Sequence, residues 1–182
     1  MTTWFTSDHH FGHANIIKLC KRPFANVEEM DAEMIRRWNA VVTEGDTVWH
    51  LGDLTLGSGD FAQEILNQLN GTVRLLAMPW HHDGRWLLPG TRTILDKANV
   101  RLENPLVVLD YPGLGDGKYP LGVTLCHYPL AVWDRKHYGA WHLHGHSHGT
   151  YHADGKIIDV GVDNWDFTPV SLEEIIERMA AL

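Results

Sequence analysis

In residues 141–148, which read WHLHGHSH, histidine occupies every second position around one glycine. A strand points alternate side chains to the same face, so His144, His146 and His148 would converge on one point if the backbone stays extended. Imidazole nitrogens gathered in this way are typical ligands of transition metals. The segment therefore indicates a metal site. The alternative is a half-exposed polar strand that is rich in histidine.

Upstream, further groups of potential ligands each follow a short apolar segment. The groups are 7–10 after 4–6, 50–53 after 47–49, 81–83 after 73–78, and His127 after 123–126. Each apolar segment is typical of a buried strand, and in α/β folds the carboxyl ends of such strands line the crevice that holds the chemistry. The pattern predicts an α/β protein with its ligands at strand ends.

The order of these motifs resembles that of the calcineurin-like metallophosphoesterase family. The matching motifs are D-x-H from Asp8 to His10, G-D at Gly52-Asp53, an H-H-D segment at 81–83 where the family has G-N-H-D, the lone His127, and G-H-x-H at 145–148. The resemblance covers residues 8–148, and the tail 159–165 is similar to that of small single-domain members from bacteria and phages. It implies a four-layer αββα sandwich, in which two mixed sheets are flanked by helices.

The resemblance also implies how two metal ions are held. Asp53 would bridge them, and the other ligands would be Asp8, His10 and His148 for the first ion and His81, His127 and His146 for the second. Carboxylates and imidazoles together suit Mn, Fe, Zn or Ni better than Mg or Ca. Two such divalent ions, about 3.5–4 Å apart, activate a bridging hydroxide for in-line attack on phosphorus.

The chain departs from the family at Trp80 and His81, which stand where the family has glycine and asparagine. Histidine can still bind a metal, but its ring nitrogen lies farther from the backbone, so we expect the second ion to shift or change identity. A glycine can serve a positive φ that is costly for tryptophan, so we expect a rebuilt loop.

His82 stands at the position of the family's active-site histidine. We predict that it assists the leaving group by donating a proton, as histidine does near neutral pH. The alternative is a contact with Asp53 or His81 that only orients these ligands. We expect the neighbouring Asp83 to orient a histidine or to cap the following segment.

Candidate substrate-binding residues are Arg22, Arg135 and His13. The two arginines lie in short basic segments and can hold a phosphate oxygen bidentately, although most arginines are only solvated surface. His13 follows Phe11-Gly12 on a loop and can reach the rim of the pocket. Among the remaining histidines, we expect His9 to face away from the metals, at the surface or behind a ligand, and His50 to be a hydrogen-bonded core residue.

Composition sets the broad class of the protein. The 182 residues fit a single domain spanning 1–182. The chain opens without a basic and apolar leader and has no run of about 18 apolar residues, so we expect a cytoplasmic protein without membrane contact. A formal net charge of −8 disfavours nucleic-acid polymers, but two bound ions would still attract a small phosphate ester such as a nucleotide. The sequence leaves the oligomeric state open.

Helices and further strands are placed by periodicity and capping signals. A helix is predicted from the capping-box segment 26–29 to about Val42, a second from Asp60 to before Asn70-Gly71, and a last one opening at 171–174. Strands are predicted at 106–110, 122–126 and 156–160, with a loop at 112–117. The two cysteines, Cys20 and Cys126, are expected to pack in the core.

These expectations favour a dinuclear metal-dependent phosphoesterase. Phosphodiesters are preferred to monoesters, because a protonating histidine helps a poor alkoxide leaving group. A phosphomonoesterase is the nearest alternative. From a different class, a catalytically degenerate member would keep the fold as a protein-interaction module; the change at Trp80 and His81 favours this, and the retained ligands oppose it.

Overall fold

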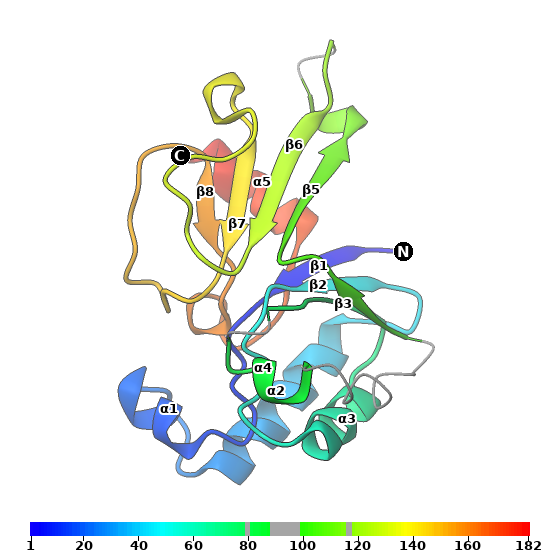
Figure 1. Cartoon of the computed structure of the whole chain (residues 1–182), viewed down its shortest axis with the longest axis vertical. Helices are drawn as coiled ribbons and strands as arrows, with labels where there is room; N and C mark the ends of the chain where they lie inside the picture. Colours follow the sequence, from blue (N-terminus) through cyan, green and yellow to red (C-terminus); the bar gives the residue numbers. More distant parts are fainter. Residues whose placement is uncertain (79–80, 88–98, 116–117) are drawn as a thin grey trace.

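The computed structural model describes residues 1–78, 81–87, 99–115 and 118–182. Its five-stranded sheet has the order β4-β3-β2-β1-β9 (Figure 1). The strands are β1 (Thr3–Thr6), β2 (Thr47–His50), β3 (Thr72–Leu76), β4 (Val100–Glu103) and β9 (Val170–Ser171). The first four are parallel and β9 is antiparallel to β1, so the sheet is mixed.

The second sheet has four strands in the order β5-β6-β7-β8. They are β5 (Leu106–Tyr111), β6 (Leu121–Cys126), β7 (Trp141–His144) and β8 (Ile157–Asp159). Here β6, β7 and β8 are parallel, and β5 is antiparallel to β6. The strands predicted at 106–110, 122–126 and 156–160 are confirmed within a residue or two.

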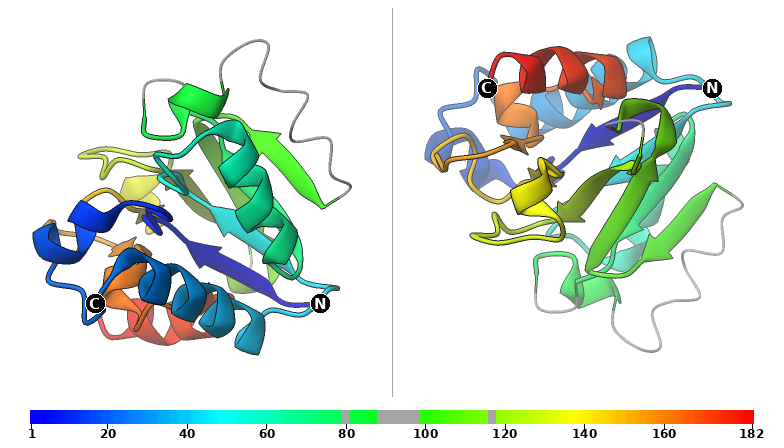
Figure 2. Two further views of the ribbon diagram at one scale, coloured as in Figure 1. Left: turned by 90° about the horizontal axis from the view of Figure 1, so that it is seen from below. Right: turned by 90° about the horizontal axis from the view of Figure 1, so that it is seen from above.

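Helices flank the sheets. They are α1 (Ala14–Leu19), α2 (Val27–Val41), α3 (Gly59–Gln68), α4 (Gly84–Leu87) and α5 (Leu172–Ala180), with short 3-10 turns at Pro112–Leu114, Lys136–Tyr138 and Val162–Asn164. Helices α2 and α3 cover the outer face of the five-stranded sheet (Figure 2), where Trp38 and Leu66 pack with Val48 and Val73. The predicted α/β class, with two mixed sheets flanked by helices, is confirmed.

The second core lies between the two sheets. Phe5 and Leu76 of the five-stranded sheet pack with Val123 and Leu143 of the other, and all four side chains are fully buried. Helix α5 adds Ile175 and other apolar side chains to the same core. Burial of these side chains stabilises the packing of the two sheets by about 25 cal/mol per Å² of apolar surface. The close-packed core therefore fixes the positions of the strand ends of one sheet relative to those of the other.

Segment 128–140 covers the outer face of the four-stranded sheet at β6 and β7. Trp133 is 6% exposed, and its ring lies 5.3 Å from that of His142 on β7. Nδ1 of His142 lies 3.0 Å from the carbonyl oxygen of Thr124, and its Nε2 accepts a hydrogen bond from the Leu130 N–H at 3.0 Å. His142 therefore pins this segment to the sheet and has a structural role.

Capping residues fix the ends of the helices. The Asn26 side chain accepts a hydrogen bond from the Glu29 N–H at the start of α2, and the predicted capping box at Ser171 and Glu174 opens α5 with both of its bonds. Helix α3 begins one residue earlier than predicted, because Ser58 caps it. Four short elements, α1, α4, β4 and β9, were not predicted from the sequence; α4 packs against α3, β4 pairs with β3 and β9 pairs with β1.

Two further observations complete the fold. Within the described residues, none of the helices has the length and apolar character that a bilayer crossing requires. The predicted rebuilding of the loop around Trp80 falls outside the described residues.

Candidate metal centre

The ligand clusters predicted from the sequence lie at the carboxyl ends of β1, β2, β3, β6 and β7, and backbone hydrogen bonds join neighbouring ends. The Asp8 N–H donates to the Gly52 carbonyl and the His10 N–H to that of Asp53, at 3.1 and 3.0 Å. The Gly145 N–H donates to the His127 carbonyl at 2.9 Å. The loops of each sheet are thus tied in pairs before any ligand binds.

The backbone of the candidate ligands is unusual. Left-handed φ angles occur at Asp8 (61°), His10 (54°), Asp53 (55°), His146 (66°) and His148 (46°). Such angles cost a non-glycine residue of order 1 kcal/mol or more and concentrate at functional sites. They also correct the expectation of an extended backbone over 144–148, because β7 ends at His144 and the histidines beyond it follow a turn.

Three side chains form what we call the Asp8 group, namely Asp8, His10 and His148. Their ligand atoms all lie within 4.8 Å of one another. Both Asp8 carboxylate oxygens accept the His146 N–H, at 3.1 and 2.9 Å. Both ring nitrogens of the buried His10 have no hydrogen-bond partner among the described residues. The rings of His10 and His148 are stacked with centroids 5.3 Å apart.

A buried ion pair supports this group. The Asp163 carboxylate lies 2.7 Å from Nδ1 of His148, which leaves the other ring nitrogen free to bind an ion. The Arg22 guanidinium donates to both Asp163 oxygens, at 2.8 and 2.9 Å, and to the carbonyl oxygens of Asp8 and His9. Since Arg22 is 4% exposed and each of its guanidinium nitrogens is engaged, the expectation that it binds substrate is corrected: it joins Asp163 to the backbone of Asp8 and His9 instead.

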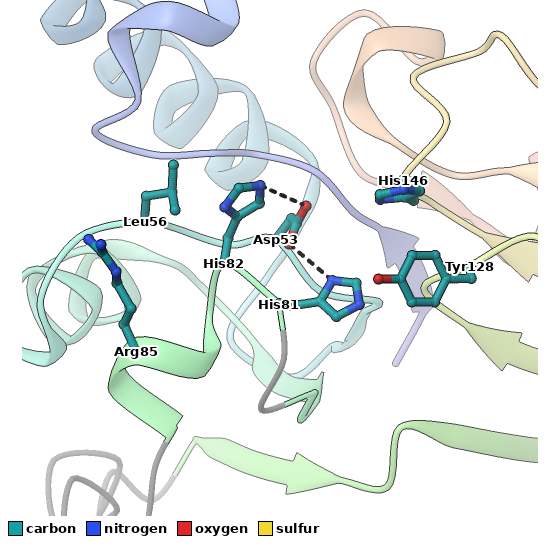
Figure 3. A pocket seen from close by; sticks show the side chains of 7 residues that line it. All are labelled: Asp53, Leu56, His81, His82, Arg85, Tyr128 and His146. Carbon is teal, nitrogen blue, oxygen red and sulfur yellow. Dashed lines mark hydrogen bonds and ion pairs between the residues drawn. The ribbon is translucent and has the colours of Figure 1, made fainter.

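Asp53 lies between two sets of imidazoles. Its Oδ2 is 3.6 Å from Nε2 of His10 and 3.5 Å from Nε2 of His127, and its Oδ1 is 3.4 Å from Nδ1 of His81. Nε2 of His82 lies 3.9 Å from the same Oδ2 (Figure 3). One carboxylate thus lies close to ring nitrogens of His10, His127 and His81 at once, which is the position that a bridging ligand requires.

The second set is the His81 group, which consists of His81, His127 and His146. Ligand atoms of Asp53, His81 and His127 lie within 4.8 Å of one another, and Nε2 of His127 is 3.3 Å from Nδ1 of His146. The rings of His81 and His127 meet edge to face at 4.1 Å. Nε2 of His81 and Nδ1 of His127 are buried without a partner.

Burial controls the charge of these ligands. It lowers the pKa of His127 to about 3 and that of His10 well below its ordinary value, so both imidazoles are neutral and offer lone pairs. It also raises the pKa of Asp8 to about 8. For Asp53, burial acts in the same upward direction, but the hydrogen bond with His81 and the nearby imidazoles outweigh it and hold the pKa below the usual range.

The arrangement fits transition-metal ions. Neutral imidazoles and carboxylates are the donor set of Mn, Fe, Zn and Ni, and buried polar atoms without a partner are rare unless a ligand satisfies them. The unpartnered Nδ1 and Nε2 of His10 are such atoms. In His81 and His127 the nitrogens that face Asp53 are Nδ1 and Nε2 respectively. The geometry therefore brings together all seven predicted metal ligands.

Comparison with known proteins places the chain among relatives. It aligns with the uncharacterized protein MJ1445 of Methanocaldococcus jannaschii at 33% identity over 183 residues, which cover 96% of this chain and 89% of that protein. The chain belongs to the family of this archaeal protein. The Gene 66 protein of Mycobacterium phage L5 is 29% identical over 200 residues, which cover 96% of the chain and 92% of the phage protein.

A solved structure has the same fold. The protein of unknown function AQ665 from Aquifex aeolicus matches 97% of this chain and 98% of its own with a TM-score of 0.68, at 20% identity. No family model matches the chain.

In this member of the archaeal protein's family, a pocket of about 460 Å³ opens beside Asp53. It is lined by Asp53, Leu56, His81, His82, Arg85, Tyr128 and His146 (Figure 3). Leu56, Arg85 and Tyr128 were not among the residues predicted from the sequence. Two of the three had a signal in the sequence, because Tyr128 directly follows His127 and Arg85 lies two residues after Asp83.

The other candidate substrate residues lie outside this lining. The His13 ring is 5.6 Å from that of His10 and 6.2 Å from that of His82, so His13 belongs to the histidine cluster without lining the pocket. Arg135 pairs with Asp110 and Asp134, at 2.7 and 2.8 Å. Its charge is therefore used on the loop over β6, which corrects the expectation that it holds substrate.

Three further histidines, His9, His50 and His144, have structural partners. His9 and His50 are fully buried, with Nδ1 of His9 3.0 Å from Nε2 of His50. The Gly52 N–H donates to Nδ1 of His50 at 3.2 Å, so the His50 proton is on Nε2 and points to His9. These contacts between His9, His50 and Gly52 connect the loop that carries Asp8 to the loop that carries Asp53. His144 turns to the Gly145 carbonyl at 2.8 Å and does not join the ligands.

Asp83 orients backbone and does not orient a histidine. Its carboxylate accepts the N–H groups of Leu54 and Thr55 at 3.1 and 3.0 Å. Burial raises its pKa to about 7, and these hydrogen bonds act against that rise. The residue ties the segment that carries His81 and His82 to the loop that carries Asp53.

Proposed function

We propose that the chain is a calcineurin-like metallophosphoesterase that hydrolyses small phosphate esters, with phosphodiesters preferred, in the cytoplasm. The observation that carries the proposal is the position of Asp53, whose single carboxylate lies within 3.6 Å of ring nitrogens of His10, from one group, and of His81 and His127, from the other. A carboxylate shared in this way is what a two-metal site for phosphoryl transfer requires.

The Asp8 group and the His81 group would each hold one divalent transition-metal ion, with Asp53 between them. Bound there, the ions would supply charge neutralisation at the phosphate and activation of the attacking water. The order of the motifs along the chain supports the same assignment.

His82 is the residue best placed to move a proton. Its side chain is 42% exposed and lines the pocket, while Nε2 lies 3.9 Å from Asp53 Oδ2. From there the imidazole can donate a proton to a leaving oxygen as the bond to phosphorus breaks. Asp83 fixes the backbone beside it, which holds the ring in reach of the pocket.

The proton donor at His82 supports esters of ordinary alcohols as substrates, and among these we propose diesters first. The alkoxide released from an alkyl diester is a poor leaving group, so protonation lowers the barrier more than it does for an acidic phenol. Among the described residues that line the pocket, Arg85 is the one arginine or lysine, so it supplies a permanent positive charge there.

The test begins with protein stripped by a chelator and reloaded separately with Mn, Zn, Ni or Fe(II). Hydrolysis of bis-p-nitrophenyl phosphate and of methyl p-nitrophenyl phosphate is measured, with the phosphomonoester alongside. We expect activity only with added metal. On an alkyl diester such as an unphosphorylated thymidine dinucleotide we expect a loss of about 10²–10⁴-fold in His82→Ala, and a smaller loss on the p-nitrophenyl esters, which release an acidic phenol. The matched control is His137→Ala, an exposed histidine outside the pocket.

Two outcomes would count against the proposal. Turnover that does not depend on added metal would contradict the proposal that a dinuclear metal centre performs the hydrolysis. Absence of turnover with every metal and ester, in a folded protein that binds two ions per chain, would favour the interaction module.

A further inference from the structure

One end of the pocket carries a positive charge that the proposed chemistry does not use. Arg85 is exposed, lines the pocket, and has no hydrogen bond or ion pair with the residues that the structure describes. Other arginines are engaged, since Arg22 pairs with Asp163 and Arg74 with Glu103. In a chain of net charge −8, a guanidinium without such a partner beside a candidate anion site is well suited to bind an anionic group of a substrate.

The backbone that carries Arg85 is fixed on both sides. Before it, Asp83 accepts the N–H groups of Leu54 and Thr55. After it, Trp86 is 2% exposed and its Nε1–H donates to the Thr55 carbonyl at 3.3 Å. The two anchors bury the neighbours of Arg85 and leave its own side chain directed to the pocket, so its placement follows from the fold of α4.

The pocket has two distinct ends. Figure 3 shows Arg85 and Leu56 on one side of Asp53, and His146 and Tyr128 on the other, with His82 between Arg85 and Asp53. A proton donor must lie next to the leaving oxygen. If His82 is that donor, the leaving group extends from the reacting phosphorus toward Arg85 and Leu56.

We propose that Arg85 binds an anionic group on the leaving side of the substrate, which makes the substrate class a phosphodiester whose leaving alcohol carries a second phosphate. The inference rests on the proposed phosphodiesterase function. The guanidinium fork matches a terminal phosphate bidentately, and Leu56 contacts the carbon skeleton between the two phosphates.

The reaction is a balanced hydrolysis. A bond forms between the water oxygen and phosphorus, the bond from phosphorus to the leaving oxygen breaks, and that oxygen takes the proton of His82. The water proton passes to solvent and His82 regains a proton from solvent. The products are a phosphomonoester and an alcohol whose own phosphate has been held by Arg85 throughout.

The experiment compares thymidine dinucleotides in the metal-loaded enzyme. The unphosphorylated dinucleotide is run beside forms with a 5′ phosphate and with a 3′ phosphate, and the products show which alcohol leaves. We expect kcat/KM to be at least tenfold higher for the form whose phosphate is on the leaving alcohol. Arg85→Gln should abolish that ratio, Arg85→Lys should keep part of it, and Arg101→Gln, an exposed and equal change of charge, should keep all of it.

Each other outcome has a definite meaning. A ratio near one in the wild type, or a ratio that survives in Arg85→Gln, overturns the inference while bis-p-nitrophenyl phosphate turnover still upholds the phosphodiesterase. Equal losses for all substrates in Arg85→Gln overturn it too, because Arg85 then holds the reacting phosphate. Absence of any diester turnover overturns the proposed function itself.

Discussion

The Asp8 group and the His81 group face the same carboxylate but are held in different ways. The Asp8 group is supported by buried charged contacts, through Asp163 to Arg22 and through the His146 N–H to Asp8. The His81 group is supported by ring packing, because the ring centroid of Tyr128 lies 4.7 Å from those of both His81 and His146. This group also opens to the pocket. The first group is therefore preorganised with mixed oxygen and nitrogen donors, and the second is rich in nitrogen and more adjustable.

Removing the carboxylate that the two groups share should abolish metal binding in both of them. In Asp53→Asn we expect both ions to be lost and hydrolysis to fall by roughly 10³-fold, since several kcal/mol of charge stabilisation disappears. Metal content after dialysis and circular dichroism are the measurements. Two ions still bound per folded chain would show that Asp53 is not the bridge.

Removing support from one group alone should separate the two. In Asp163→Asn, the ring of His148 loses its carboxylate partner, so we expect the affinity of the Asp8 group for its ion to fall about 10–100-fold and that of the His81 group to change little. Calorimetric titration of the stripped protein measures both. Asp166→Asn is the matched control, because Asp166 is 87% exposed and pairs only at the surface with Arg37. Equal weakening of both ions would contradict the separation.

The part of the centre that the sequence predicted is the part that depends on local pattern. Apolar segments followed by Asp8, Asp53 or His127 place these ligands at strand ends, because a strand and the residue after it are adjacent in the chain as well as in space. The same locality misled the reading of 144–148, where alternating histidines imitate a strand although His146 and His148 lie on a left-handed turn.

The support of the centre is not local, which is why the sequence did not reveal it. Arg22 and Asp163 are 141 residues apart, and nothing in either segment indicates the other. An isolated arginine reads as surface or as substrate-binding, and only the packed structure shows it buried. The long helices were predictable from capping and periodicity, whereas α4, which directs Arg85 to the pocket, has only four residues and no period to detect.

Replacing the unusual ligand should sharpen the chemical difference between the groups. His81→Asn exchanges an imidazole nitrogen for an amide oxygen, so we expect the preference of the His81 group for Zn over Mn to fall by about tenfold. Competition binding with both metals, read by metal analysis, tests this without any assay of activity. A preference that stays unchanged would mean that His81 does not contact the ion.

The smallest expected effect concerns the loop that continues from His10. The Gly12 N–H donates to both oxygens of Asp31, at 3.2 and 3.0 Å, and burial raises the pKa of this carboxyl from 3.8 to about 6, against the effect of that hydrogen bond. A raised pKa means that the folded state holds the proton more tightly than the unfolded state does. The contribution to stability is therefore present below pH 3.8 and lost as the pH rises through about 6.

Asp31→Asn removes this titration while keeping an oxygen that accepts the Gly12 N–H. We expect the free energy of unfolding of the variant, relative to the wild type, to rise by about 1 kcal/mol between pH 4 and pH 7, a modest value because the group is partly solvated. Urea unfolding of the metal-free proteins at several pH values measures it. Parallel pH curves would show that Asp31 is ionised in the folded protein without cost.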